Sequence, residues 1–275
     1  REASFSNTSG QHNVALGQSA NYAITTGGSN VGVGSQALRF NTTAANNTAV
    51  GYQAVYTNTT GTSNVGLGAY ALLSNTSASY NTAVGYQAML DNTTGQFNVG
   101  IGQMALANNT TANSNTAMGY QAGNLNTTGA NNTVIGFQCF EDNTTGAFNV
   151  AMGAKALASN TSSSENVAVG YQSLYSMSST GDANKSTAVG YQAGYTSTHN
   201  VDAFGAQALY SNTTGVLSVA MGREALYSNT TGSYNTAIGY QAGFFITSGA
   251  KNTILGRHNG NQGGLDIRTS SNNIV

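Results

Sequence analysis

The chain has 275 residues, a formal net charge of −1, and only 6% charged residues. A surface this poor in Lys and Arg cannot neutralise phosphates, so we expect no binding of nucleic acid. No run of about 20 apolar residues occurs, so we also expect no membrane-spanning segment.

Glycine recurs every 17 residues from Gly17 to Gly170, changes its spacing once at Gly190 and Gly205, and then keeps the same spacing through Gly256. A fixed period of this length is typical of a solenoid, in which each repeat buries its apolar side by stacking on its neighbours. A disordered low-complexity chain has no reason to hold such a phase. The sequence therefore predicts a repeat array over residues 1–256, with an irregular coil at about 176–205.

One full copy of the repeat, residues 47–61, reads Asn-Thr-Ala-Val-Gly-Tyr-Gln-Ala-Val-Tyr-Thr-Asn-Thr-Thr-Gly. The residues alternate as in a β-strand. One face carries Thr48, Val50, Tyr52 and Ala54, and the other carries Ala49, Gly51 and Gln53. Asn-Thr-Thr-Gly supplies turn chemistry, and glycine recurs too often for an amphipathic helix. We predict a short strand, a bend, a second short strand and a turn in each coil. The predicted fold is all-β, a parallel β-solenoid of about 15 coils of 17 residues.

Stacked coils place like residues above like residues. Up to Phe137, Tyr follows the repeat glycine in alternate coils and a smaller residue follows it in the others, so we expect each bulky ring there to lie over a small residue of the next coil. The Asn of each Asn-Thr-Thr-Gly turn should form a side-chain amide ladder. The predicted structural repeat residues are Gly51, Gly85, Gly119, Tyr52, Tyr86, Tyr120, Asn58, Asn92 and Asn126, and the full Asn column is Asn41, Asn58, Asn75, Asn92, Asn109, Asn126, Asn143 and Asn160.

A coil of this composition has few large apolar side chains to bury, many of them Ala or Val. Because ordering each residue costs conformational entropy, one thin coil gains little net stability by itself. The sequence therefore predicts a homo-oligomer in which several chains share an axial core.

The segment Asn-Thr-Ala-Val-Gly-Tyr-Gln-Ala resembles the head repeat of trimeric autotransporter adhesins, in which Asn-Ser-Val-Ala-Ile-Gly is followed three residues on by Ala. It is more similar to the Asn-Thr-Ala-[Val/Ile]-Gly-Tyr-Gln-Ala-Leu repeats of bacteriophage tail fibres and receptor-binding proteins. The resemblance covers residues 13–256 and implies a left-handed parallel β-roll built as a homotrimer. The tail is similar to the segment that leads many phage fibres into a self-cleaving chaperone domain, so residues 257–275 are predicted as a C-terminal exit segment.

The irregular coil admits two interpretations. Asp182 and Lys185 lie close in sequence to His199 and Asp202, and they are candidates for a ligand contact or metal site on a protruding loop. The alternative is a tolerated surface insertion with solvated charges.

Other chemistry is not indicated. The three histidines, His12, His199 and His258, lie too far apart and at different phases of the repeat to form a zinc site. The adjacent Glu141 and Asp142 make a poor acid–base pair, and no catalytic or phosphate-binding motif occurs. We expect no enzymatic activity, no cofactor and no metal. Cys139, the only cysteine, is interpreted as a small buried thiol.

The leading functional hypothesis is a structural and adhesive fibre, the trimeric shaft or head of a viral tail fibre that attaches to a host-surface glycan or protein receptor. Its expected location is a virion or another extracellular surface. The alternatives are a bacterial trimeric adhesin head, a self-assembling extracellular filament subunit and an ice-binding solenoid. Ice binding would need Thr-x-Thr on strands, whereas the paired threonines here, such as Thr59 and Thr60, are adjacent and predicted to lie in turns.

Overall fold

The computed structural model describes residues 2–177, 185–262 and 265–275, and these form a parallel β-solenoid with about 17 residues per turn. The predicted fold class is therefore confirmed. The chain divides into two compact units, Arg1–Val134 and Ile135–Val275, called here the N-terminal unit and the C-terminal unit. The described residues contain no helix that could span a lipid bilayer.

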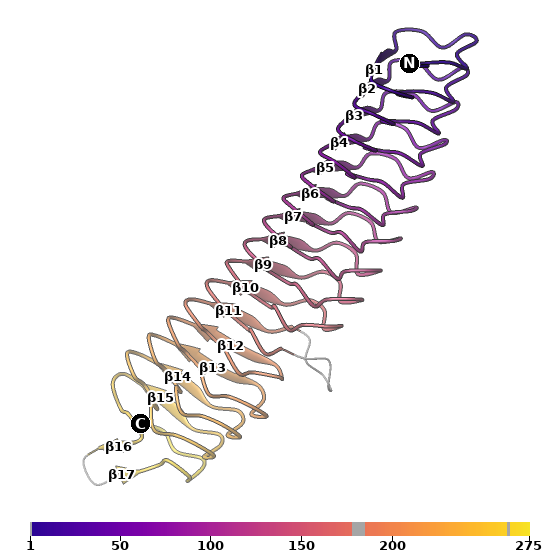
Figure 1. The fold of residues 1–275 in the computed structure, drawn as a ribbon. Coiled ribbons are helices and arrows are strands. Elements are labelled where there is room, and N and C mark those ends of the chain that lie inside the picture. The colour runs from indigo at the N-terminus through magenta and orange to yellow at the C-terminus, as the bar shows by residue number, and fades with distance from the viewer. Residues whose placement is uncertain (1, 178–184, 263–264) are drawn as a thin grey trace. The chain divides into compact units, whose positions relative to one another are not determined.

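Each coil contributes one short parallel strand, and the strands of a unit pair in chain order (Figure 1). Between neighbouring coils each residue pairs with the residue one repeat later, as in Val31 with Thr48 and Val65 with Thr82. The N-terminal unit contains β1 (Val14–Leu16), β2 (Val31–Val33), β3 (Thr48–Val50), β4 (Val65–Leu67), β5 (Thr82–Val84), β6 (Val99–Ile101) and β7 (Thr116–Met118), and β8 (Thr133–Ile135) lies at the boundary. The C-terminal unit contains β9 (Val150–Met152), β10 (Val167–Val169), β11 (Thr187–Val189), β12 (Val201–Phe204), β13 (Ser218–Met221), β14 (Thr236–Ile238) and β15 (Thr253–Leu255).

The predicted second strand of each coil is wrong. After the repeat glycine the backbone turns, and Gln53 and Val55 both have φ of 52°. Ser63, just before the next strand, has φ of 57°. Left-handed angles of this kind cannot belong to a β-strand, and they cost an ordinary side chain about 1 kcal/mol each or more. The coil is therefore one strand followed by a series of turns.

The repeat glycine ends each strand because only glycine fits there. Gly51 has φ of 138°, and a Cβ placed on it would lie 2.5 Å from the carbonyl oxygen of Gly68 in the next coil. Gly85 has φ of 135° and a Cβ there would meet the carbonyl oxygen of Gly102 at the same distance. Both the left-handed angle and the close approach of successive backbones exclude a side chain. This requirement explains the constant spacing of the glycines.

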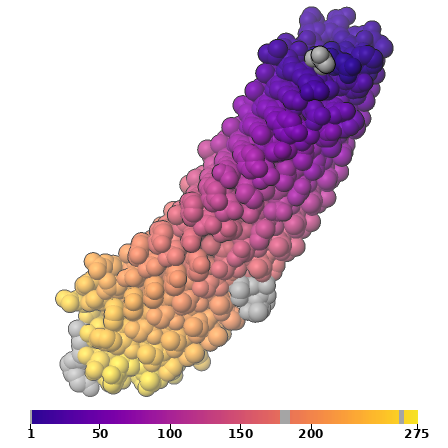
Figure 2. All heavy atoms as spheres, viewed as in Figure 1, coloured from indigo at the N-terminus to yellow at the C-terminus, as the bar shows by residue number. Residues whose placement is uncertain are grey.

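The apolar part of the core comes mainly from three positions of the coil. We number these positions 1 to 17, so that in the coil of residues 47–63 position 1 is Asn47 and position 17 is Ser63. Positions 3 and 8 are small and buried, as in Ala49 and Ala54, and position 9 is large and buried, as in Leu72. In each unit the coils adjoin as successive layers of atoms (Figure 2).

Position 9 of one coil packs against position 3 of the next. Where position 9 is Val55 or Met89, position 3 of the next coil is glycine, and a Cβ on that glycine would lie 2.6 Å from Val55 or 2.9 Å from Met89. Where position 9 is Gly243, position 3 of the next coil is the buried Ile254. At Gly243 the larger residue at position 3 thus fills the space that the glycine leaves, as close packing requires.

The tyrosines after the glycine do not form this core, which corrects the expectation of rings stacked over small residues. Tyr52 and Tyr86 lie at the surface, with exposed fractions of 45% and 46%. Tyr70 of the intervening coil contacts both rings edge to face, at centroid distances of 5.3 and 6.0 Å. Tyr52 is exposed as Val50 is, as the strand alternation places it, whereas Ala54 of the same predicted face is buried, because the backbone turns into the left-handed region at Gln53.

The polar part of the core consists of two asparagine ladders at positions 12 and 1. The first was predicted: Asn58 Nδ2 donates to Asn41 Oδ1 at 2.9 Å, and Asn75 Nδ2 donates to Asn58 Oδ1 at 2.8 Å. The second was not predicted: the backbone N–H of Asn64 donates to Asn47 Oδ1 at 2.9 Å. Both asparagines of one coil also bind the same turn carbonyl, since Asn47 and Asn58 donate to Gly61 O at 2.9 and 2.8 Å. Fully buried amides are thereby satisfied without charge.

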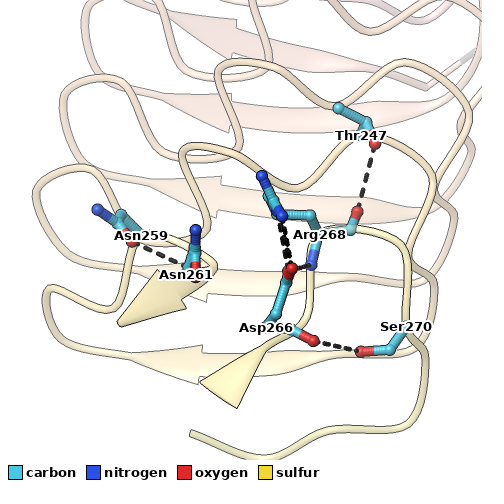
Figure 3. Close-up of polar contacts among 6 residues, drawn as sticks. All are labelled: Thr247, Asn259, Asn261, Asp266, Arg268 and Ser270. Carbon is cyan, nitrogen blue, oxygen red and sulfur yellow. Dashed lines mark hydrogen bonds and ion pairs between the residues drawn. The ribbon is translucent and has the colours of Figure 1, made fainter. Parts of the chain in front are cut away.

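Residues 257–275, predicted as an exit segment, begin with the short antiparallel strands β16 (Asn261–Gln262) and β17 (Leu265–Asp266) and then run along the coil of β15. Thr253 N donates to Asn273 O at 2.7 Å, and Thr247 Oγ1 donates to Arg268 O at 3.3 Å (Figure 3). Arg268 also pairs with Asp266 at 2.6 Å, and both side chains are about half exposed. This segment therefore carries the hydrogen-bond pattern of the coils beyond β15.

Candidate functional site

The outward face of each strand is the most distinctive surface of the molecule. The middle residue of a strand points into the core, while positions 2 and 4 point outward, as the burial of Ala83 between the partly exposed Thr82 and Val84 shows. Position 4 is a large apolar residue in every strand from β1 to β15. We call the outward residues at positions 2 and 4 the apolar ridge of each unit. Its position-4 members are Leu16, Val33, Val50, Leu67, Val84, Ile101 and Met118 in the N-terminal unit, and Ile135, Met152, Val169, Val189, Phe204, Met221, Ile238 and Leu255 in the C-terminal unit.

The described residues of this chain do not cover the ridge. The exposed fraction is 39% for Val50, 40% for Met118 and 43% for Met221. Single exposed apolar residues are ordinary, but a contiguous apolar face on successive strands marks an interaction site. The ridge therefore has the character of an interaction surface.

Aromatic residues lie on both sides of the ridge in sequence. Position 6 holds Tyr52 and Tyr86 on one side, and position 17 holds Tyr80 and Phe97 on the other. Tyr80 and Phe97 stack with ring centroids 5.1 Å apart and remain 55% and 56% exposed. Their φ angles are 62° and 59°, so bulky rings are held in a left-handed conformation without being buried. Such residues are strained for little internal gain, which favours a role in contacts.

A second aromatic feature runs along position 10 of the C-terminal unit. Tyr175, Tyr195, Tyr210, Tyr227 and Phe244 stack in succession, with centroid distances of 5.0 to 5.3 Å. Burial and the neighbouring tyrosines raise the pKa of Tyr195. Since each inner ring is covered on both faces by its neighbours, this ladder offers ring edges and hydroxyls to a ligand but no inner ring face for sugar stacking. Its main effect is to stabilise the stack of coils.

The irregular coil brings several of the candidate loop residues together. Asp182 lies outside the described residues. Lys185 is described: its Nζ lies 3.8 Å from Glu165 Oε2, and both side chains are more than half exposed. Lys185 also lines a hollow of about 180 Å³ that is completed by Asn200, Val201, Asp202, Leu217 and Ser218. Within that hollow Asn200 Oδ1 is buried and has no hydrogen-bond partner.

The remaining titratable groups do not assemble into a reactive centre. Among the described residues no three His, Cys, Asp or Glu side chains approach closely enough to hold a metal ion. Cys139 is fully buried, and burial raises its pKa to about 12, so it stays a neutral thiol. Burial and the adjacent Asp142 raise the pKa of Glu141, whose carboxylate accepts a hydrogen bond from Gln138 at 3.2 Å. This arrangement holds one carboxylate in place but presents no nucleophile beside it.

The predicted repeat residues occupy three different environments. The glycines Gly51, Gly85 and Gly119 are backbone positions, with φ between 135° and 138°. Tyr52, Tyr86 and Tyr120 are 40% to 46% exposed, while Asn58, Asn92 and Asn126 are at most 1% exposed. Of these nine residues, only the tyrosines could touch a partner.

The Asn-Thr-Thr triplets also match the glycosylation sequon, and the chemistry of the turns accounts for the same residues. The structure supplies that chemistry: the Asn is buried, and the first Thr donates to a backbone carbonyl of the next coil, as Thr59 Oγ1 does to Thr76 O at 3.0 Å. The second Thr, such as Thr60, is exposed at the turn.

The ridge could have been recognised from the sequence, because a large apolar residue directly precedes every repeat glycine. The hollow could not, because it depends on how two coils of unequal length stack. No family model, no curated protein and no solved structure matches this chain.

Proposed function

We propose that the protein is a structural and adhesive fibre component that associates with copies of itself through the apolar ridge. One observation carries the proposal: successive strands in each unit present a large, partly exposed apolar side chain at position 4. Burying such side chains is favourable by roughly 25 cal/mol per Å² of apolar surface. Repeated over many coils, this contribution is large enough to hold chains together.

The occupant that fits the ridge best is another copy of the chain. The ridge repeats with the pitch of the coils, about 4.8 Å. Only a partner with the same pitch keeps its side chains aligned with the ridge over many coils, and a second copy has that pitch by construction. A chain with 6% charged residues also presents little like-charge repulsion to its copies. The resemblance of the repeat to trimeric fibre proteins favours three copies.

The mass and shape of the particle test this step. A trimer has three times the 28.0 kDa of one chain, about 84 kDa, which light scattering after size exclusion resolves from a monomer. Met118→Asp places a charge on the ridge and should shift the particle towards monomer. Thr111→Asp, at an exposed turn position of the preceding coil, is the matched control and should leave the mass unchanged. A monomeric wild-type chain would refute self-association, and negative-stain images of compact globules would refute a fibre.

Attachment to a host surface is the second step of the proposal. The exposed residues outside the ridge are mostly uncharged hydroxyl, amide and phenol side chains, such as Thr60, Tyr86 and Tyr120. Such groups suit hydrogen bonding to a neutral glycan. Binding of the intact oligomer to an array of neutral and anionic glycans tests this step, and the absence of binding to any glycan would favour a purely structural shaft.

Ice binding has less support. The positions that face outward on the strands hold large apolar residues at position 4, such as Ile101 and Met118, and the paired threonines lie at turns. A measurement of thermal hysteresis separates this alternative from a fibre.

A further inference from the structure

A ridge that repeats every coil raises a problem of register. If one copy slides by one coil along another, position 4 still meets a large apolar residue and position 2 still meets Val or Thr. The slipped pair therefore loses the ridge contacts of only about one coil relative to the aligned pair. Self-association through the ridge, on which this inference rests, therefore needs a feature that defines one alignment.

The irregular coil supplies the only such break in the strands β1 to β15. Asp202 occupies position 2 of β12, facing Thr187 of β11 and Val219 of β13, and it is the only charged residue at positions 2 and 4 of these fifteen strands. Its carboxylate has no hydrogen bond or ion pair within the described part of the chain. A carboxylate at this place would lie within an apolar interface once the ridge is covered.

The surroundings of Asp202 contain hydrogen-bond acceptors but few free donors. The coil between Gly190 and Gly205 is two residues shorter than the regular coils, and Val201 takes the position of the ladder asparagine. The hollow beside Asp202 contains Asn200 Oδ1, buried and without a partner, and Ser218, whose hydroxyl already accepts from Asn235 N at 3.1 Å. A cationic donor would satisfy both the carboxylate and the amide oxygen.

Lys185 is the cation placed to supply that donor. It lies on the rim of the same hollow, in the coil before Asp202, yet it forms no ion pair with Asp202 in its own chain. Its side chain is 72% exposed, and its contact with Glu165 at 3.8 Å is long and solvated. Such a contact contributes little, so the ammonium group is free to turn towards a neighbouring molecule.

We infer that the hollow at the irregular coil is a register lock between copies of the chain, in which Asp202 and Asn200 of one copy receive Lys185 of a second copy. In the aligned assembly each carboxylate meets an ammonium group. After a slip of one coil, Asp202 is buried against Val or Thr without a partner, which is strongly unfavourable. In coiled coils, a single polar residue in the apolar interface fixes the register of the helices in the same way.

Photo-crosslinking reads the register directly. Chains with p-benzoylphenylalanine in place of Ile238, the exposed position-4 residue of β14, are assembled with isotopically heavy chains, and the cross-linked coil is identified by mass spectrometry. We expect cross-links to one coil of the heavy chain. Asp202→Thr gives the residue that β11, β14 and β15 carry at this position, so the chain should fold and associate. Its cross-links should spread over at least two neighbouring coils.

Two further variants define the controls. Thr187→Val changes the same position in β11 without touching the charge and should keep a single cross-linked coil. Asp202→Lys combined with Lys185→Asp exchanges the two charges and should restore the single coil that either change alone disperses.

Each outcome decides one point. A single coil in Asp202→Thr would overturn the register lock, and failure of the charge exchange to restore it would overturn the role of Lys185. Monomeric wild-type chains would instead overturn self-association, and the mass measurement detects that result before any cross-link is mapped.

Discussion

Asn75→Ala tests whether the buried amide ladder stabilises the solenoid. Asn75 lies in the middle of the ladder of the N-terminal unit and is fully buried. Its Nδ2 donates to Asn58 Oδ1 at 2.8 Å and to Ala78 O at 3.1 Å, and its Oδ1 accepts from Asn92 Nδ2 at 3.1 Å. The substitution removes all three bonds at once.

The three losses are not equal. Ala78 O keeps the hydrogen bond from Asn64 Nδ2 at 2.8 Å, and Asn92 Nδ2 keeps its bond to Gly95 O at 3.0 Å. Asn58 Oδ1 is left buried without a donor, which costs about 1–3 kcal/mol. Adding the small cavity left by the truncated side chain, we expect the free energy of unfolding to fall by about 2–4 kcal/mol.

The chain already tolerates one such loss at each natural end of the ladder. Asn160 Oδ1 and Asn229 Oδ1 are buried without a partner, because the following coils carry Met177 and Ile246 in place of Asn. We therefore expect Asn75→Ala to fold and to unfold at a lower urea concentration.

The assay is urea unfolding followed by circular dichroism at one fixed chain concentration, because self-association would couple stability to concentration. Ser77→Ala, an exposed turn position two residues away, is the control and should change the free energy of unfolding by less than about 0.5 kcal/mol. If the Asn75→Ala midpoint coincided with that of the control, the ladder would not stabilise the fold and the reasoning would be refuted.

Three further predictions concern the backbone, the core and the thiol. Gly85→Ala should lower the free energy of unfolding by more than about 3 kcal/mol in the same urea assay, whereas Gly256→Ala, with no atom within 4 Å of its added Cβ, should cost less. Gly66→Ala should cost about 1–3 kcal/mol, because the added Cβ would lie 2.6 Å from Val55 Cγ2. Val55→Leu in the same chain removes the branch at Cβ and gives the combination that Leu72 and Ala83 have at these positions, so it should recover part of the loss. Simple additivity of the two changes would contradict the pairing of positions 9 and 3. Because its pKa is raised to about 12, Cys139 should remain a thiol at pH 8 and resist alkylation until urea unfolds the chain, and rapid alkylation of the folded protein would show that the coil opens there.

The sequence by itself determined the architecture. A glycine at constant spacing fixes the length of the coil, because only glycine allows the left-handed backbone and the close approach seen at Gly51. The turn asparagines gave the position-12 ladder for the same reason: in a stack of equal coils, residue i must lie beside residue i+17. Both features are local patterns that the stacking simply repeats.

The tertiary structure decided which side chains face the core and which face the surface. The strand period placed Ala54 on the same face as Val50 and Tyr52, but the left-handed turns at Gly51 and Gln53 end that period. Val50 and Tyr52 are exposed, while Ala54 is buried. Three features depend on contacts between coils: the second ladder, the packing of position 9 against position 3, and the hollow at Asp202. The directions of the side chains that make these contacts follow no sequence period. Direction in such turns follows from backbone angles, and these angles are set by the packing of the neighbouring coils.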